Sequence, residues 1–184
     1  MCPWSSPSIP SLPELQDALA ALVTADDRAP IPACLSALSE TDVRRYARGL
    51  RHKRWAEVAA TVPLATRVIP DLGVRYDAWL RAHPPPMTDT LLPPGAAEAL
   101  RALPALTRGL AGDPGQASYA AELLAFEVLR ACARADGISR SLRTGFPIHA
   151  LANDLRAGLI PVDPPCEGHL YRFDRGGARH RRLP

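Results

Sequence analysis

The sequence predicts a mainly α-helical protein, in which a helical body carries a small C-terminal α+β tail made of one helix and a winged-helix-like β-hairpin. Apolar residues recur at helical spacing through most of residues 11–137, and prolines and glycines separate the helical stretches. Residues 169–173 instead alternate between polar and apolar side chains, as a strand does. Hydrophobic residues make up 47% of the 184, which is enough for a packed core and excludes wholesale disorder.

We expect three parts along the chain. Residues 1–10 hold three prolines among serines and should form a flexible lead-in. Residues 11–137 should form a helical domain, and residues 138–184 should form a C-terminal module, because the character of the sequence changes after Gly137.

Capping signals and proline stops delimit the helices expected in the helical domain. Ser11 followed by Glu14 forms a capping box, and Ser39 followed by Asp42 repeats the signal before a longer helix. Gly137 is a suitable C-cap for the last helix, which has the best-phased apolar stripe. The helices are expected over residues 13–24, 40–60, 64–69, 71–82, 96–110 and 116–135. The stripe of the last helix consists of Tyr119, Leu123, Phe126, Leu129 and Ala133.

The C-terminal module should contain one short helix and one hairpin. Pro147 is well placed to open a helix that ends near Ala157, because proline suits the first turn of a helix. Two strands are expected over residues 169–173 and 178–183, joined by a glycine-containing turn over residues 175–177.

Enzyme and metal motifs are absent from the sequence. The chain has no motif typical of nucleotide-binding proteins, serine hydrolases or zinc proteases. No histidine lies four residues from another histidine or from a carboxylate on one expected helix, and no two cysteines are close in sequence. The sequence therefore predicts no catalytic residue, no metal site and no cofactor in this chain. The histidines and cysteines of the chain are His52, His83, His149, His169, His180, Cys2, Cys34, Cys132 and Cys166.

The N-terminus and the composition favour a cytoplasmic bacterial protein without membrane association. The N-terminus has neither the basic region nor the apolar segment of a secretory signal, and no run of eighteen apolar residues occurs. All but one of the 22 basic residues are arginine, a bias that a GC-rich genome imposes on its codons. The count of arginines therefore needs no functional explanation, whereas their placement does.

Half of the basic residues lie in residues 44–54 and 172–182, and these two stretches hold a single acid, Asp174. Within the first stretch and the residue that follows it, helical spacing aligns five residues in a stripe that suits the binding of phosphates or an acidic peptide. A solvated face is the alternative, since arginine is also a good helix former. The stripe consists of Arg44, Arg48, Arg51, His52 and Trp55, of which Arg44, Arg48, Arg51 and Trp55 are the expected binding residues.

The second basic stretch places Arg172, Arg175 and Arg179 on the expected hairpin. These residues suit the binding of a partner, but basic residues on an edge strand can also serve only to prevent aggregation between sheets. The open edge of such a hairpin can itself accept an extended peptide as an additional strand.

Four short motifs occur in order along residues 40–135. They are Arg45-Tyr46-Ala47-Arg48, Val62-Pro63-Leu64, Trp79-Leu80-Arg81-Ala82-His83-Pro84-Pro85 and Tyr119-Ala120-Ala121-Glu122-Leu123-Leu124-Ala125-Phe126-Glu127. In this order the motifs resemble the DNA-binding domain family that includes the HvfC- and BufC-like proteins.

The resemblance implies a non-catalytic accessory protein. Members of this family look like partners of multinuclear non-haem iron-dependent enzymes that modify ribosomally made precursor peptides, and the iron belongs to the partner enzyme. The resemblance further implies that the motif residues form the scaffold, with Glu122 or Glu127 pairing with an arginine. These scaffold residues are Tyr46, Pro63, Trp79, His83, Pro84, Glu122 and Glu127.

Three functions therefore follow as hypotheses from the sequence. The first is an accessory subunit that helps an iron-dependent enzyme to engage its precursor peptide. The second is a DNA-binding transcriptional regulator that uses the basic helix and the hairpin. The third is a small enzyme that acts alone, which the missing motifs disfavour.

Overall fold

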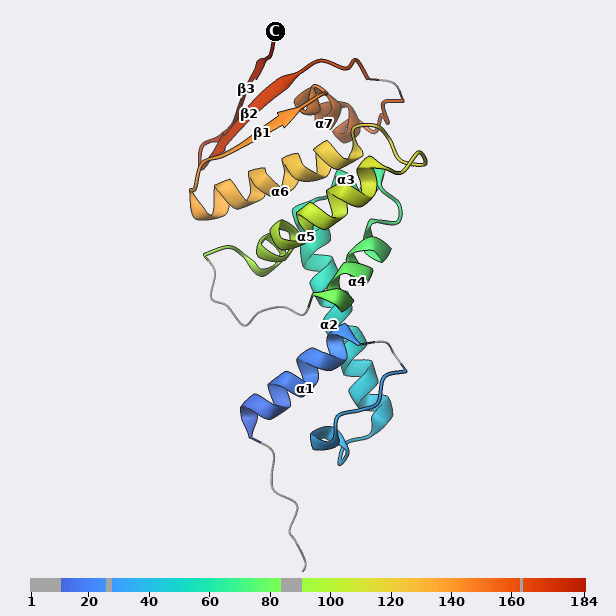
Figure 1. Ribbon diagram of the computed structural model, residues 1–184. Coiled ribbons are helices and arrows are strands. Elements are labelled where there is room, and N and C mark those ends of the chain that lie inside the picture. The colour runs from blue at the N-terminus through green and yellow to red at the C-terminus, as the bar shows by residue number, and fades with distance from the viewer. Residues whose placement is uncertain (1–10, 26–27, 84–90, 163) are drawn as a thin grey trace, which may run out of the picture.

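The computed structural model describes residues 11–25, 28–83, 91–162 and 164–184 (Figure 1). The described residues form a mainly helical body followed by a small antiparallel sheet, which confirms the predicted fold class. The expected lead-in over residues 1–10 lies outside them, as does Pro84. The α-helices are α1 (Leu12–Thr24), α2 (Glu40–Thr61), α3 (Ala65–Val68), α4 (Leu72–Ala82), α5 (Pro94–Ala111), α6 (Ala120–Asp136) and α7 (Ile148–Arg156). A 3₁₀ helix, η1 (Ala33–Leu35), precedes α2, and the strands are β1 (Arg140–Thr144), β2 (His169–Asp174) and β3 (Gly177–Arg182).

The ends of the first and the last body helix follow the predicted capping signals. At α1, the Ser11 side chain accepts a hydrogen bond from the Glu14 amide, and the Glu14 carboxylate accepts one from the Ser11 amide at 2.7 Å. At α6, Gly137 adopts the left-handed conformation with φ 74°, and its amide donates to the Ala133 carbonyl oxygen at 3.0 Å. Only glycine adopts this conformation without steric cost, which explains why the helix stops there.

Buried apolar residues form three clusters that follow one another along the molecule. The first joins α1, η1 and the beginning of α2, and it lies at the end of the molecule opposite the sheet (Figure 1). The second joins the later part of α2 with α3, α4, α5 and one face of α6. The third joins the other face of α6 with α7 and the sheet. The proposed division at Gly137 stays a prediction, but residues on both sides of it share the third cluster.

Helix α6 therefore contributes to two clusters with two opposite faces. Residues four apart on one face pack against α5 and its neighbours, and residues on the other face pack against α7 and the sheet. The predicted apolar stripe is the face toward the sheet, so one of the two buried faces was predicted from the sequence. The face toward α5 consists of Ala120, Leu124, Val128 and Cys132.

Two carboxylates of α6 bind backbone amides rather than arginines, contrary to the expectation from the resemblance. Glu127 is buried and accepts hydrogen bonds from the amides of Leu64 and Ala65, at 3.0 and 2.7 Å. These amides belong to the start of α3, where no earlier turn of helix can accept from them. Glu122 accepts from the Gly145 amide at 2.9 Å and so ties the end of β1 to α6.

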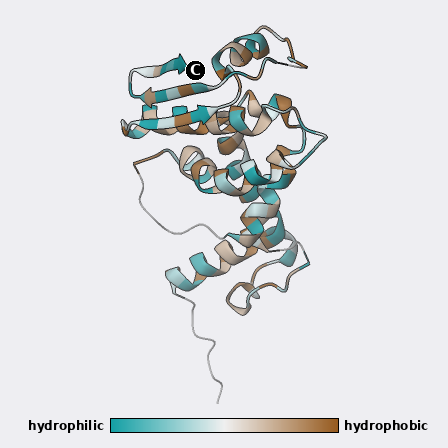
Figure 2. Ribbon diagram, turned by 45° about the horizontal axis from the view of Figure 1, so that its top comes forward, coloured by the Kyte–Doolittle hydropathy of each residue, from teal (hydrophilic) through white to brown (hydrophobic). Residues whose placement is uncertain are grey.

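The sheet has the order β1-β2-β3, with both pairs antiparallel. The hairpin β2–β3 agrees with the prediction, whereas strand β1 was not predicted. Leu142, the one apolar residue of β1, lies opposite Tyr171 of β2. Residues 140–144 therefore form a strand because they pair with β2, and not because of their own pattern of apolar residues. Figure 2 shows the resulting arrangement, in which the sheet lies against the helices. The Phe126 ring meets the rings of Tyr171 and Phe173 edge-on, with centroids 5.1 and 5.2 Å apart.

Gly95 allows the first turn of α5 to lie directly against the end of α2. A Cβ atom at Gly95 would overlap the backbone carbonyl of Glu57, which cannot move away as a flexible side chain can. We therefore expect Gly95→Ala to lower the free energy of unfolding by about 1–3 kcal/mol, the usual cost of overpacking. Urea denaturation of the purified chain measures this change.

The control for this variant is Gly49→Ala in α2. Gly49 is an exposed helical residue, and a Cβ atom there would meet nothing within 4 Å. This substitution should instead stabilise the protein by about 0.5–1 kcal/mol, because alanine loses less backbone entropy in a helix. Equal effects of the two substitutions would contradict the proposed close contact.

The link between α6 and β1 should make the stability depend on pH. Arg140 donates two hydrogen bonds to Asp136, at 2.6 and 2.8 Å, and this contact lowers the pKa of Asp136 to about 2. The unfolded chain has an aspartate pKa of about 3.9, so it binds the proton first as the pH falls. The contribution of Asp136 is thus complete above about pH 4 and is lost as the pH falls toward 2.

We expect Asp136→Asn to make the acid-induced loss of stability shallower, as measured by denaturant unfolding at a series of pH values. Asp77→Asn is the control, because the ion pair of Asp77 with Arg81 is more exposed and joins neighbours within one helix. An unchanged acid dependence in Asp136→Asn would contradict the role assigned to this pair.

Candidate binding surfaces

Two arginines of the predicted stripe on α2 hold the chain segment that leads into this helix. Arg44 donates to Glu40 at 2.8 Å and to the Ala29 carbonyl oxygen at 3.1 Å. Arg51 donates to the Ala25 carbonyl oxygen at 3.0 Å. Because α1 ends at Thr24, both side chains tie the connection between the two helices to α2. Their charges are therefore used within the fold.

Two further residues of the same part of α2, Arg54 and Trp55, also make contacts within the fold. Arg54 forms an ion pair with the buried Glu98 of α5, and so it joins α2 to α5. The Trp55 ring packs beside Tyr76, with the ring centroids 5.5 Å apart, and it covers Gly73. Of the three arginines of the predicted stripe, Arg48 alone is exposed and makes no hydrogen bond or ion pair with the residues that the structure describes.

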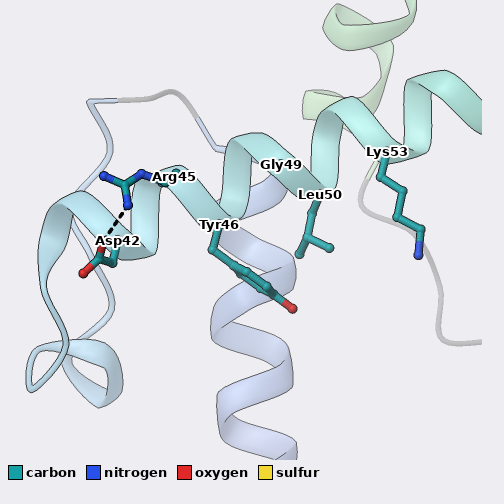
Figure 3. A pocket seen from close by; sticks show the side chains of 6 residues that line it. All are labelled: Asp42, Arg45, Tyr46, Gly49, Leu50 and Lys53. Carbon is teal, nitrogen blue, oxygen red and sulfur yellow. Dashed lines mark hydrogen bonds and ion pairs between the residues drawn. The ribbon is translucent and has the colours of Figure 1, made fainter.

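The opposite side of α2 carries a shallow hollow (Figure 3). Tyr46 lies at its centre with 54% of its surface exposed, next to Leu50. Arg45 is paired with Asp42 at 3.1 Å, while Lys53 extends from the far side of the hollow. Tyr46, which the resemblance places in the scaffold, is thus an exposed residue of an amphipathic surface.

Arginines of the second basic stretch lie on one face of the sheet. Tyr171 and Phe173 point toward α6, so the alternate residues of β2 point away from it. The register places Arg172 opposite Arg179, and Leu170 opposite Arg181, on this outer face. Arg143 of β1 lies opposite Leu170 on the same face. The outer arginine face therefore consists of Arg143, Arg172, Arg179 and Arg181, all of them exposed.

Acidic neighbours neutralise little of this face. Asp174 accepts a hydrogen bond from Arg179 at 2.6 Å, and this contact holds the pKa of the Asp174 carboxyl below its usual range. Arg182 belongs to the inner face and is paired with Glu167 at 3.0 Å. Arg175 lies in the turn, where its guanidinium is 3.4 Å from the position of a Cβ atom on Gly137. The structure thus brings Arg172 and Arg179 to one face, whereas Arg175 lies in the turn, and the role of all three in binding a partner stays a prediction.

Strand β3 is an open edge of the three-stranded sheet that the structure describes. The Leu183 amide donates to the Gly168 carbonyl oxygen at 2.7 Å, so this pair is hydrogen-bonded. Hydrogen-bonded pairs alternate with others in antiparallel sheets, so the amides and carbonyls of Arg182, His180 and Ala178 face away from β2. The edge therefore offers a row of backbone groups beside the outer arginine face.

Three histidines that are far apart in the sequence gather on the inner face of the sheet. They are His149 at the start of α7, His169 in β2 and His180 in β3. Burial lowers the pKa of His149, and the neighbouring His180 and His169 lower it further. Short spacings in the sequence do not reveal this group, because its members come from three different elements, although the alternation of β2 already places His169 on the face of Tyr171.

Comparisons of this chain with protein-family models, with curated proteins and with solved structures find no match. The resemblance to the HvfC- and BufC-like family therefore stays a prediction. Within the described residues, no helix has both the length and the apolar character that crossing a bilayer requires.

The contacts of α2 predict that its arginines are not equivalent. We expect Arg51→Gln to lower the free energy of unfolding by about 1 kcal/mol, the typical worth of a hydrogen bond, because it loosens the connection between α1 and α2. Arg48→Gln, on the same helix but exposed, should change stability by less than about 0.5 kcal/mol. Thermal and urea unfolding of both variants test this difference, and a larger effect of Arg48→Gln would refute it.

Proposed function

We propose that the protein is a non-catalytic binding protein that holds an extended acidic peptide on its C-terminal sheet. The observation that carries this proposal is the outer arginine face, where four exposed arginines share one face of the sheet with Asp174, whose carboxylate is paired with Arg179. Arginine is well suited to binding carboxylates, because its planar guanidinium can donate two parallel hydrogen bonds.

The open edge of β3 favours a peptide that binds in an extended conformation. A peptide that adds to this edge would pair its backbone with the outward-facing groups of Ala178, His180 and Arg182. Every second side chain of the peptide would then lie on the arginine face, since strand side chains alternate. A sequence with acidic residues at alternate positions satisfies both requirements.

The proposed biological setting follows from the sequence resemblance. The peptide would be the ribosomally made precursor of an iron-dependent peptide-modifying enzyme, and this chain would present it to that enzyme. The iron would belong to the partner enzyme. Co-expression with a multinuclear non-haem iron enzyme encoded beside this chain, followed by pulldown, tests the partnership, and recovery of no such enzyme would refute it.

DNA binding is the less favoured alternative. It would use the basic helix together with the hairpin, but Arg44, Arg51 and Arg54 of α2 are engaged within the fold. The basic part of α2 and the sheet also lie toward opposite ends of the molecule (Figure 1). The formal net charge of +3 gives only weak long-range attraction to a duplex.

The peptide proposal is tested with a fluorescent synthetic peptide in which glutamate alternates with valine. Fluorescence anisotropy should show binding to the full chain, and Arg172→Glu with Arg181→Glu should weaken it about tenfold or more through charge repulsion. Arg48→Glu with Lys53→Glu is the matched control on α2 and should leave the affinity unchanged.

Two outcomes would contradict this proposal. Equal loss of affinity in both double variants would show attraction by overall charge rather than by the sheet. Tight binding of a DNA duplex, weakening steeply with salt while the peptide does not bind, would favour the DNA-binding alternative.

A further inference from the structure

Three imidazole rings converge where α7 meets the hairpin. The potential ligand atoms of His149, His169 and His180 all lie within 4.8 Å of one another. The rings of His149 and His180 are stacked with centroids 3.7 Å apart, and His169 lies 5.7 and 5.8 Å from them. Three different elements supply the rings, so the fold itself brings them together.

His169 is the most informative member of this histidine cluster. It is 5% exposed, and both of its ring nitrogens are buried without a hydrogen-bond partner among the described residues. Glu167 is near, but its carboxylate oxygen is 4.0 Å from Nε2, which is too long for a hydrogen bond. A buried imidazole nitrogen without a partner is costly, because it has lost its contact with water and gained nothing in return.

His149 is already oriented by a neighbour in the way that metal-binding histidines usually are. Its Nδ1 lies 2.9 Å from the Tyr171 hydroxyl, which also accepts a hydrogen bond from the His149 amide at 3.3 Å. In the tautomer with hydrogen on Nδ1, that nitrogen donates to Tyr171 and the Nε2 lone pair is available. Metal-bound histidines commonly use their second nitrogen for such an orienting bond.

We infer that His149, His169 and His180 form a binding site for a divalent transition-metal ion of the zinc class. Neutral imidazole nitrogens are preferred ligands of these ions, and three of them leave a fourth position for water. Tetrahedral zinc with bonds of about 2.0–2.1 Å needs nitrogens about 3.3 Å apart. His180 is exposed on the edge strand, so rotation of its side chain can supply the closer approach.

The charges around the histidine cluster are compatible with a cation. Glu167 lies beside His169 and also pairs with Arg182, whose charge it partly offsets. The Glu167 carboxylate, 4.0 Å from Nε2 of His169, can oppose the charge of the ion, either as a hydrogen-bond partner of bound water or as a fourth ligand.

Zinc binding is tested on the untagged full chain by isothermal titration with Zn²⁺ after treatment with a chelator. We expect one ion per chain and a rise in the unfolding temperature, since a ligand that binds the folded state stabilises it. Co²⁺ should give the intense visible absorption of a tetrahedral site. Tyr171→Phe should weaken zinc binding about 10- to 100-fold, the usual effect of removing an orienting partner.

His180→Ala is the main variant, because His180 is exposed and its loss leaves the core intact. It should abolish the one-to-one binding and the Co²⁺ absorption, with circular dichroism unchanged. His52→Ala removes an exposed histidine of α2 and is the matched control, which should bind zinc as the original chain does.

Absence of zinc binding by the original chain would overturn the inference and leave the cluster as packed aromatic rings. Binding that persists in His180→Ala, or that falls equally in His52→Ala, would also overturn it. None of these results depends on the acidic peptide, so the metal site and the proposed function can fail separately.

Discussion

The burial of α6 on two opposite faces is the constraint on which the rest of the structure depends. One face, with Leu124 and Val128, closes the cluster formed by α2–α5, and the other, with Leu123 and Phe126, supports α7 and the sheet. Polar groups on the same helix complete the connection, because Glu127 binds the amides that open α3 and Glu122 binds the end of β1. A helix that is apolar on one side only would leave either the body or the sheet without a partner surface.

The chemistry of the sheet follows from this packing. Tyr171 and Phe173 must face Phe126, so the period of two along the strands sends the intervening arginine, Arg172, to the outside. The same alternation sends His169 and His180 inward, toward the start of α7. One register therefore produces a basic outer face and a histidine-lined inner face, and a slip by one residue would exchange them.

The sequence predicted the elements well where local signals were strong. Capping at Ser11 and the stop at Gly137 were predicted from short-range chemistry, and both are present. Strand β1 was missed because Leu142 is its only apolar residue, so its conformation depends on pairing with a distant strand. The arginines of α2 were expected to face a partner, because helical spacing places them on one side of the helix. Helical spacing does not show which other segment of the chain lies against that side. Ala25 and Ala29 supply that neighbour for Arg51 and Arg44.

By itself, the sequence determined the mainly helical class, the order and approximate limits of the helices, the hairpin and the two basic stretches. These depend on residues a few positions apart, whose spacing, capping and turn preferences act locally. Only the tertiary structure decided which arginines remain available and that three histidines meet. Both outcomes depend on contacts between different elements of the fold. The connection after α1 lies against α2 and engages two of its arginines, whereas packing of α7 and the sheet against α6 brings the three histidines together.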